Sequence, residues 1–168
     1  MDLRRNVAAL SLGIAACLSI VGCAPKAEQE AQVAVDETPL AQGEKAVKRE
    51  MWVSVPFSLE SDAEARVGVT LTSGPAIDVY VVAEAGLNRW KTLVSKAQES
   101  EDQTFEHFSS LGLEGVSDSF TSDWSELAAG TYYLLIDNTS EFGTSPPSPG
   151  GDDIATVSYK VETRPPGQ

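Results

Sequence analysis

Apolar and polar residues alternate along several short segments of this chain. The alternation covers residues 51–59, 66–72, 77–82, 131–137 and 154–163. Because successive side chains of a β-strand point to opposite faces, this period of two predicts half-buried strands. Turn-forming residues separate the segments, and short strands spaced about ten residues apart are typical of β-sandwiches. The pattern therefore predicts an all-β fold, a single antiparallel β-sandwich over residues 49–163.

The pattern between these strands is less regular. Residues 87–94 fit a further strand, whereas residues 91–100 fit a short helix, and both interpretations stay open. Residues 105–113 and 116–120 predict two strands around a turn. The spacing within residues 123–126 matches a capping box and predicts one helical turn.

Both ends of the sandwich are flanked by segments without strand periodicity. Residues 23–48 are rich in Ala, Glu, Gln and Lys, contain no aromatic residue, and are interrupted by Pro25, Pro39 and Gly43. Such a composition buries too little apolar surface to order itself, so we expect a flexible tether. Residues 164–168 predict a disordered tail.

The first residues carry a targeting pattern. Arg4 and Arg5 precede the uncharged run from Val7 to Val21, which is shorter than the roughly 20 residues that a transmembrane helix needs. A positive start, an apolar run and small residues are typical of a signal that is removed. The alternatives are an anchor that is never cleaved and a signal peptide cut elsewhere.

The end of this run, Ile20-Val21-Gly22-Cys23, resembles the lipobox of bacterial lipoproteins. The resemblance implies that residues 1–22 are a signal peptide that is cut off, and that Cys23 receives acyl chains that bind the protein to a membrane. Two or more chains anchor a protein stably. Ala24, rather than Asp, follows the cysteine, and this implies the outer membrane if the source is Gram-negative.

Charge and cysteine content narrow the classes of partner. The chain has 12 Lys and Arg against 25 Asp and Glu, a net charge of −13. Nucleic acid is therefore a poor partner, and anionic lipid headgroups would repel the domain. The one other cysteine, Cys17, lies within the predicted signal peptide, so no disulfide framework is expected.

A second resemblance covers the C-terminal third. Residues 127–139, which include Gly130-Thr-Tyr-Tyr-Leu-Leu-Ile-Asp-Asn138, and the following residues 155–161 are similar to the C-terminal half of GOLD domains and to jelly-roll domains appended to secreted peptidases. These families are binding and assembly modules. The resemblance implies a jelly-roll-like sandwich without catalytic activity. The second part of this expectation depends on analogy between folds alone.

The polar residues offer few sites for chemistry. His107 is the one histidine and falls on the polar side of its segment, so we expect a surface side chain without zinc or a catalytic triad. Asp137, Asn138, Asp152 and Asp153 flank one loop and could hold a structural calcium ion. The alternative is a solvated loop in which the first two cap a turn.

Three aromatic residues suggest a contact surface. Trp52 and Tyr80 fall on the polar side of their strands, and Tyr133 points away from the face that carries Leu134 and Ile136. An exposed aromatic face suits sugar stacking or a protein interface. The alternative is that these residues pack in a second layer or at the edges of the fold.

These observations lead to one leading hypothesis with two alternatives. The chain is expected to be an exported, lipid-anchored protein of the cell envelope that acts as a non-catalytic binding or assembly module. Its partner would be an envelope protein or a glycan. The alternatives are a carbohydrate-binding module and, more distantly, a small envelope hydrolase.

Overall fold

The computed structural model describes residues 38–95, 104–139 and 154–168, all of which belong to one compact unit of the chain. Among these residues, no helix has the length and apolar character needed to cross a membrane. The elements in chain order are β1 (Thr38–Lys48), β2 (Trp52–Leu59), β3 (Ala63–Ser73), β4 (Ile77–Ala83), α1 (Glu84–Ser95), a 3-10 turn (Ser109–Leu111), β5 (Leu113–Val116), β6 (Ser119–Thr121), β7 (Ser125–Leu127), β8 (Gly130–Asp137) and β9 (Ile154–Arg164).

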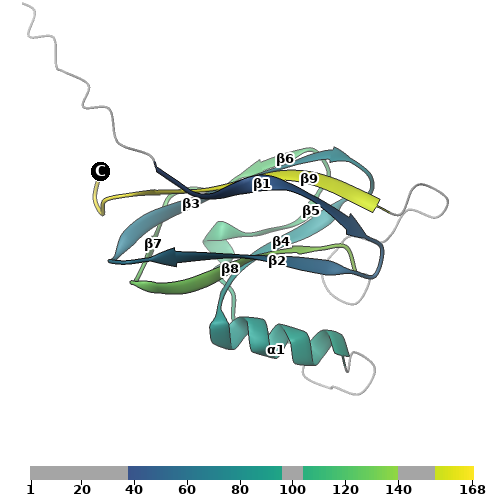
Figure 1. Ribbon diagram of the computed structural model, residues 1–168, viewed down its shortest axis with the longest axis horizontal. Coiled ribbons are helices and arrows are strands. Elements are labelled where there is room, and N and C mark those ends of the chain that lie inside the picture. Colours follow the sequence, from purple (N-terminus) through teal and green to yellow (C-terminus); the bar gives the residue numbers. More distant parts are fainter. Residues whose placement is uncertain (1–37, 96–103, 140–153) are drawn as a thin grey trace, which may run out of the picture. The chain divides into compact units, whose positions relative to one another are not determined.

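Two antiparallel sheets pack face to face (Figure 1). The five-stranded sheet has the order β1-β9-β3-β6, with β7 also paired to β3, and the four-stranded sheet has the order β2-β8-β4-β5. Strand β1 pairs with β9, β2 with β8, β3 with β6 and β4 with β5. This nested pairing is the arrangement of a jelly roll. The prediction of an all-β antiparallel sandwich is confirmed.

The main core lies between the two sheets. In β8, Tyr132, Leu134 and Ile136 point into this core, and the last two are fully buried. The opposite sheet contributes the alternate residues of β3 and β9, among them Val67 and Val157. The alternation read from the sequence thus assigns the core face of these strands correctly, as period-two patterning should.

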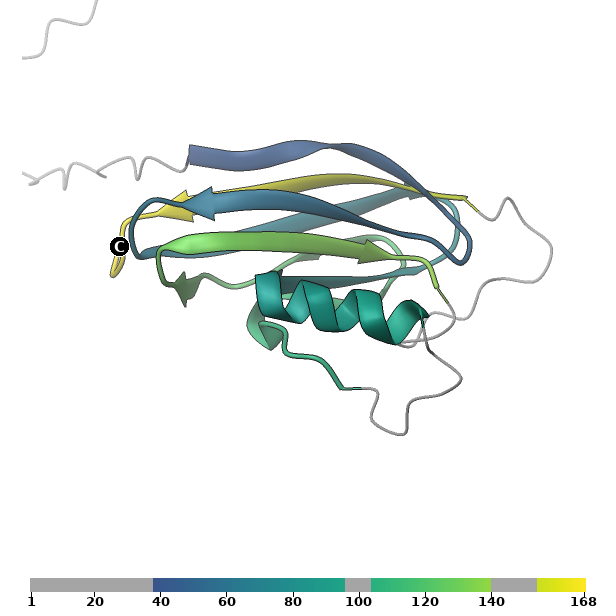
Figure 2. The ribbon, with the colours of Figure 1, turned by 60° about the horizontal axis from the view of Figure 1, so that its bottom comes forward.

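A second apolar layer lies on the outer face of the four-stranded sheet, where α1 packs across it (Figure 2). The helix contributes Leu87, Trp90 and Leu93, spaced three residues apart on one helical face. The sheet contributes Tyr80 and Leu135, among others. Both faces of β4 are therefore buried. Of the two alternatives for the region that follows, the helix is confirmed, because residues 84–95 form α1 and residues 87–94 are not a strand.

The prediction of a tether over residues 23–48 is wrong for residues 38–48, which form the edge strand β1. Ten residues of this strand pair in register with β9. Only Val47 in it is fully buried, whereas most of its other side chains are exposed. A strand held by pairing with β9 rather than by its own apolar residues has almost no periodic signal. Residues 23–37 lie outside the described part of the chain.

Three further sequence predictions need correction. Residues 105–113 and 116–120 are not a pair of strands around a turn, because β5 joins the four-stranded sheet and β6 the other sheet. Residues 123–126 contain the start of β7, whose Glu126 pairs with Glu64 on β3, and not a helical turn. At the C-terminus β9 extends through Arg164, which the sequence assigned to the tail.

Candidate functional site

The three predicted contact aromatics do lie on one face, but that face is not open. Trp52, Tyr80 and Tyr133 belong to the outer layer of the four-stranded sheet, together with Trp90 of α1. Tyr80 is only 3% exposed, and the ring of Trp52 meets that of Trp90 edge-on at 6.5 Å. The expectation of an exposed aromatic face is therefore wrong for Tyr80, and the alternative of second-layer packing is confirmed for it, because the apolar side of α1 packs on this face. Trp52 and Tyr133 are half-buried at its margins.

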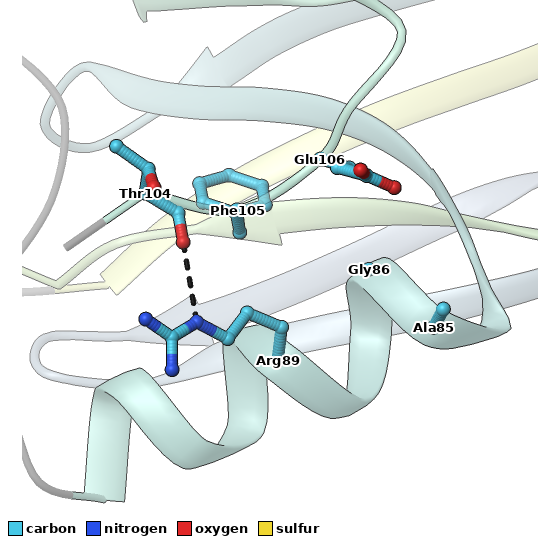
Figure 3. A pocket seen from close by; sticks show the side chains of 6 residues that line it. All are labelled: Ala85, Gly86, Arg89, Thr104, Phe105 and Glu106. Atoms are coloured by element: carbon cyan, nitrogen blue, oxygen red, sulfur yellow. Dashed lines mark hydrogen bonds between the residues drawn. The ribbon is translucent and has the colours of Figure 1, made fainter. Parts of the chain in front are cut away.

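One hollow of about 540 Å³ opens between the start of α1 and residues 104–106 (Figure 3). Arg89 Nε donates a hydrogen bond of 3.3 Å to the carbonyl oxygen of Thr104, and the Phe105 ring lies above the helix. Gly86 is required here, since a Cβ at this position would lie 2.5 Å from the carbonyl oxygen of Glu106. The hollow thus lies where α1 and residues 104–106 meet, and the hydrogen bond of Arg89 connects these two segments.

A second hollow, of about 390 Å³, is lined by Tyr80, His107, Leu113 and Glu114. Tyr80 Oη donates to Glu114 Oε1 at 3.1 Å, and the imidazole ring of His107 packs edge-on against Tyr80 at 5.3 Å. Burial, followed by the charge of Asp78, raises the pKa of Tyr80 far above its usual value, so the phenol keeps its proton and acts as a donor. The prediction of a surface His107 is confirmed.

Two buried carboxyl groups face each other at the end of the four-stranded sheet. Asp78 on β4 and Asp137 on β8 are register partners, and both are fully buried. Asp78 Oδ1 accepts a 2.6 Å hydrogen bond from Gly115 N–H, whereas Asp137 accepts bonds from the N–H and hydroxyl groups of Thr139 at 3.1 and 2.9 Å. Burial raises the pKa of Asp137 to about 7, and the nearby charges of Asp78 and Glu50 act in the same direction.

The predicted calcium ligands are only partly within the described structure. The carboxylate of Asp137 is engaged by Thr139, and Asn138 Nδ2 donates to the carbonyl oxygen of Val47 at 3.0 Å. Asp152 and Asp153 lie outside the described residues. Within the described ranges, no group of three or more His, Cys, Asp or Glu side chains has an arrangement that could hold a metal ion.

The outer face of the five-stranded sheet carries a charged cluster that the sequence pattern alone does not reveal. Arg66 Nη2 donates to Glu162 Oε2 at 2.8 Å, and Lys160 also pairs with this carboxylate. Hydrogen bonding from Lys160, supported by Arg66, lowers the pKa of Glu162. Arg164 pairs with Glu64, and the guanidinium carbons of Arg66 and Arg164 lie 4.5 and 4.4 Å from the ring centre of Trp124.

The ion pairs of this cluster connect β3 to β9, and the Trp124 ring is covered by arginine side chains and is not free to stack on a sugar. Cation–π contacts from two arginines hold the Trp124 ring against β3 and β9. The only sequence signal was the alternation of charged residues on the polar positions of β3 and β9, which a solvated face shares. Long-range pairing of the two strands brings these charges together.

Several of the large aromatic and charged side chains contact other parts of the same domain. Trp90 packs against Trp52 and Tyr80, and Arg66 and Arg164 on the five-stranded sheet pair with Glu162 and Glu64. Besides the hollows at Arg89 and at His107, one of about 560 Å³ lies over Gly43 and Tyr159 of the five-stranded sheet, and one of about 400 Å³ is lined by residues that include Asp62 and Leu127. No protein family model matches the chain, and no curated protein matches its sequence.

Proposed function

We propose that this chain is an exported lipoprotein, anchored through acyl chains on Cys23, whose jelly-roll domain is a non-catalytic binding or assembly module of the cell envelope. The observation that carries the proposal is the order of features in residues 1–23: two arginines, an uncharged apolar run and a small residue before Cys23. Acyl chains supply about 0.8 kcal/mol per buried methylene, so two chains suffice for stable attachment.

The position of β1 adds a geometric argument. The first strand starts at Thr38, so the covalent connection from Cys23 to the domain consists of residues 24–37. Fourteen residues reach at most about 50 Å. Such a connection allows the domain to stand off the lipid surface, while the excess of acidic residues disfavours its collapse onto anionic headgroups.

The domain itself supports a contact role more than a sugar-stacking role. A carbohydrate-binding face would need aromatic rings open to solvent, and Tyr80 and Trp90 are instead buried against each other with centroids 5.7 Å apart. The partner that we propose is a protein of the envelope.

Replacement of the lipidated residue tests the proposal directly. Cys23→Ser removes the acceptor thiol, so labelled palmitate should enter the parent protein and not this variant, and the variant should shift from the membrane to the soluble fraction. Cys17→Ser is the matched control, because this thiol lies in the predicted signal peptide and its loss should leave labelling intact. Equal labelling of parent and Cys23→Ser would refute the lipid anchor.

A further inference from the structure

The sheet edges of the sandwich are protected to very different degrees. Strand β2 carries the exposed Pro56 in its middle, and proline cannot donate a hydrogen bond to an added strand. Strands β5, β6 and β7 contain only four, three and three residues. Short strands and prolines are the usual means of preventing edge-to-edge association. Three sides of the two sheets are thus blocked.

Strand β1 is different, because it is an eleven-residue edge that pairs with β9 on one side only. Among the described strands, none pairs with its other side. Its one proline, Pro39, lies beside a register irregularity at the start of the strand, so the regular part runs from Ala41 to Lys48. Nearly all side chains of this part are exposed. Lys45 and Lys48 place charge on this edge. Its length still leaves enough unpaired backbone groups to act as a template for strand addition.

The charges along β1 narrow the registers in which a second copy of this strand can pair with it. Directly opposed residues of antiparallel strands point to the same face of a sheet. If the outer faces of two sheets are to stay on the same side when two copies of β1 pair, the two-fold axis must therefore lie at a residue of β1, which then faces its own copy. An axis at Glu44 or at Lys45 would place like charges directly opposite each other, which is destabilising. An axis at Gly43 avoids this conflict, since Gln42 then faces Glu44 of the second copy and Ala41 faces Lys45 of the second copy. An axis at Ala46 avoids it too and sets Glu44 against Lys48, but the two strands then overlap over residues 44–48 alone.

The length of the strand favours the axis at Gly43. Gly43 is the midpoint of the strand Thr38–Lys48, so this register gives the longest overlap of two full copies.

We propose that β1 pairs antiparallel with β1 of a second copy of this chain about an axis at Gly43, and that the two five-stranded sheets thereby become one continuous sheet. Pairing of two antiparallel edges is an isologous interface, because each copy offers the same segment to the other. The inference goes beyond the proposed function and does not depend on lipid attachment.

Cross-linking between two tagged full-length copies tests this register. One copy carries Gln42→Cys and the other Glu44→Cys, both at exposed positions, so that mild oxidation joins them across the axis. The Cα atoms of directly opposed strand residues lie within the separation that a disulfide allows. We therefore expect at least about ten-fold more linked dimer from this pair than from the control pair. The control pair combines Gln42→Cys with Thr70→Cys, an exposed position on β3. Mass spectrometry of the linked peptides identifies the joined positions.

Charge substitution gives an independent readout. Gln42→Lys should increase the amount of one tagged copy that co-purifies with the other, and Gln42→Glu should decrease it, because residue 42 faces Glu44 of the second copy twice in the pair. Thr70→Lys and Thr70→Glu make the same charge changes away from the edge and should have no effect. A 42–44 cross-link no stronger than the control, linkage of the Gln42→Cys chain to another protein alone, or equal co-purification of the charge variants would overturn the proposal.

Discussion

Replacing Leu134 by alanine is expected to lower the free energy of unfolding by about 2–5 kcal/mol. Leu134 is fully buried in the centre of β8, where its side chain lies between the two sheets. Truncation there loses the transfer free energy of the removed atoms and leaves a cavity that two hydrogen-bonded sheets cannot easily close. Urea unfolding of parent and variant measures the difference.

The matched control is Leu113→Ala on β5, where the leucine side chain is 46% exposed. Surface substitutions usually change stability by no more than about 0.5 kcal/mol. A domain is typically stable by about 5–15 kcal/mol, so the core variant should unfold at clearly lower denaturant than the control. Similar losses for both leucines would contradict the assignment of Leu134 to the core between the sheets.

The stability of the domain is expected to fall as the pH rises from 4 to 8 because of Asp137. Burial raises the pKa of this carboxyl group in the folded state from 3.8 to about 7. Between these two values the folded state holds a proton that the unfolded state has released, so the contribution is fully present below pH 4 and is lost as the pH passes 7. The difference between the two pKa values corresponds to a change of at most about 4 kcal/mol in the free energy of unfolding.

Asp137→Asn tests this origin of the pH dependence. Asparagine resembles the protonated acid, and its amide retains an acceptor for Thr139 N–H, so the variant should match the parent at pH 4 and exceed it in stability at pH 8. Asp123→Asn, at an exposed position, should leave the profile of the parent unchanged. Urea unfolding at intervals between these pH values, with a chelator present, provides the profiles. A profile of Asp137→Asn as steep as that of the parent would contradict the prediction.

The strands that the sequence predicts are those whose own side chains build the core. Val67 and Val69 on β3, and Leu134 and Ile136 on β8, alternate with residues that point away from it, so a period of two is visible without any tertiary information. Strand β1 gives no such signal, because its order comes from backbone pairing with β9. Its partner is more than 100 residues away in the chain, which no local pattern can reveal.

The surfaces were harder to predict than the core, and for one physical reason. Asp78 and Tyr80 occupy polar positions of an alternating strand, which read as solvent-facing until a helix is placed over them. The helix α1 follows β4 directly and packs back onto the same sheet (Figure 2), so positions that look exposed become a second apolar layer. The Arg66–Glu162 and Arg164–Glu64 pairs likewise depend on contacts between distant strands.

The mass of the N-terminal peptide of the mature protein, extracted from the membranes of its native host, tests the central claim most directly. A lipid-anchored envelope module should begin at Cys23, lack residues 1–22, and carry on this cysteine the added mass of a diacylglyceryl group, with or without a third acyl chain on the amine. A peptide that still contains residues 1–22, or that begins at or near residue 23 with an unmodified thiol, would contradict the claim.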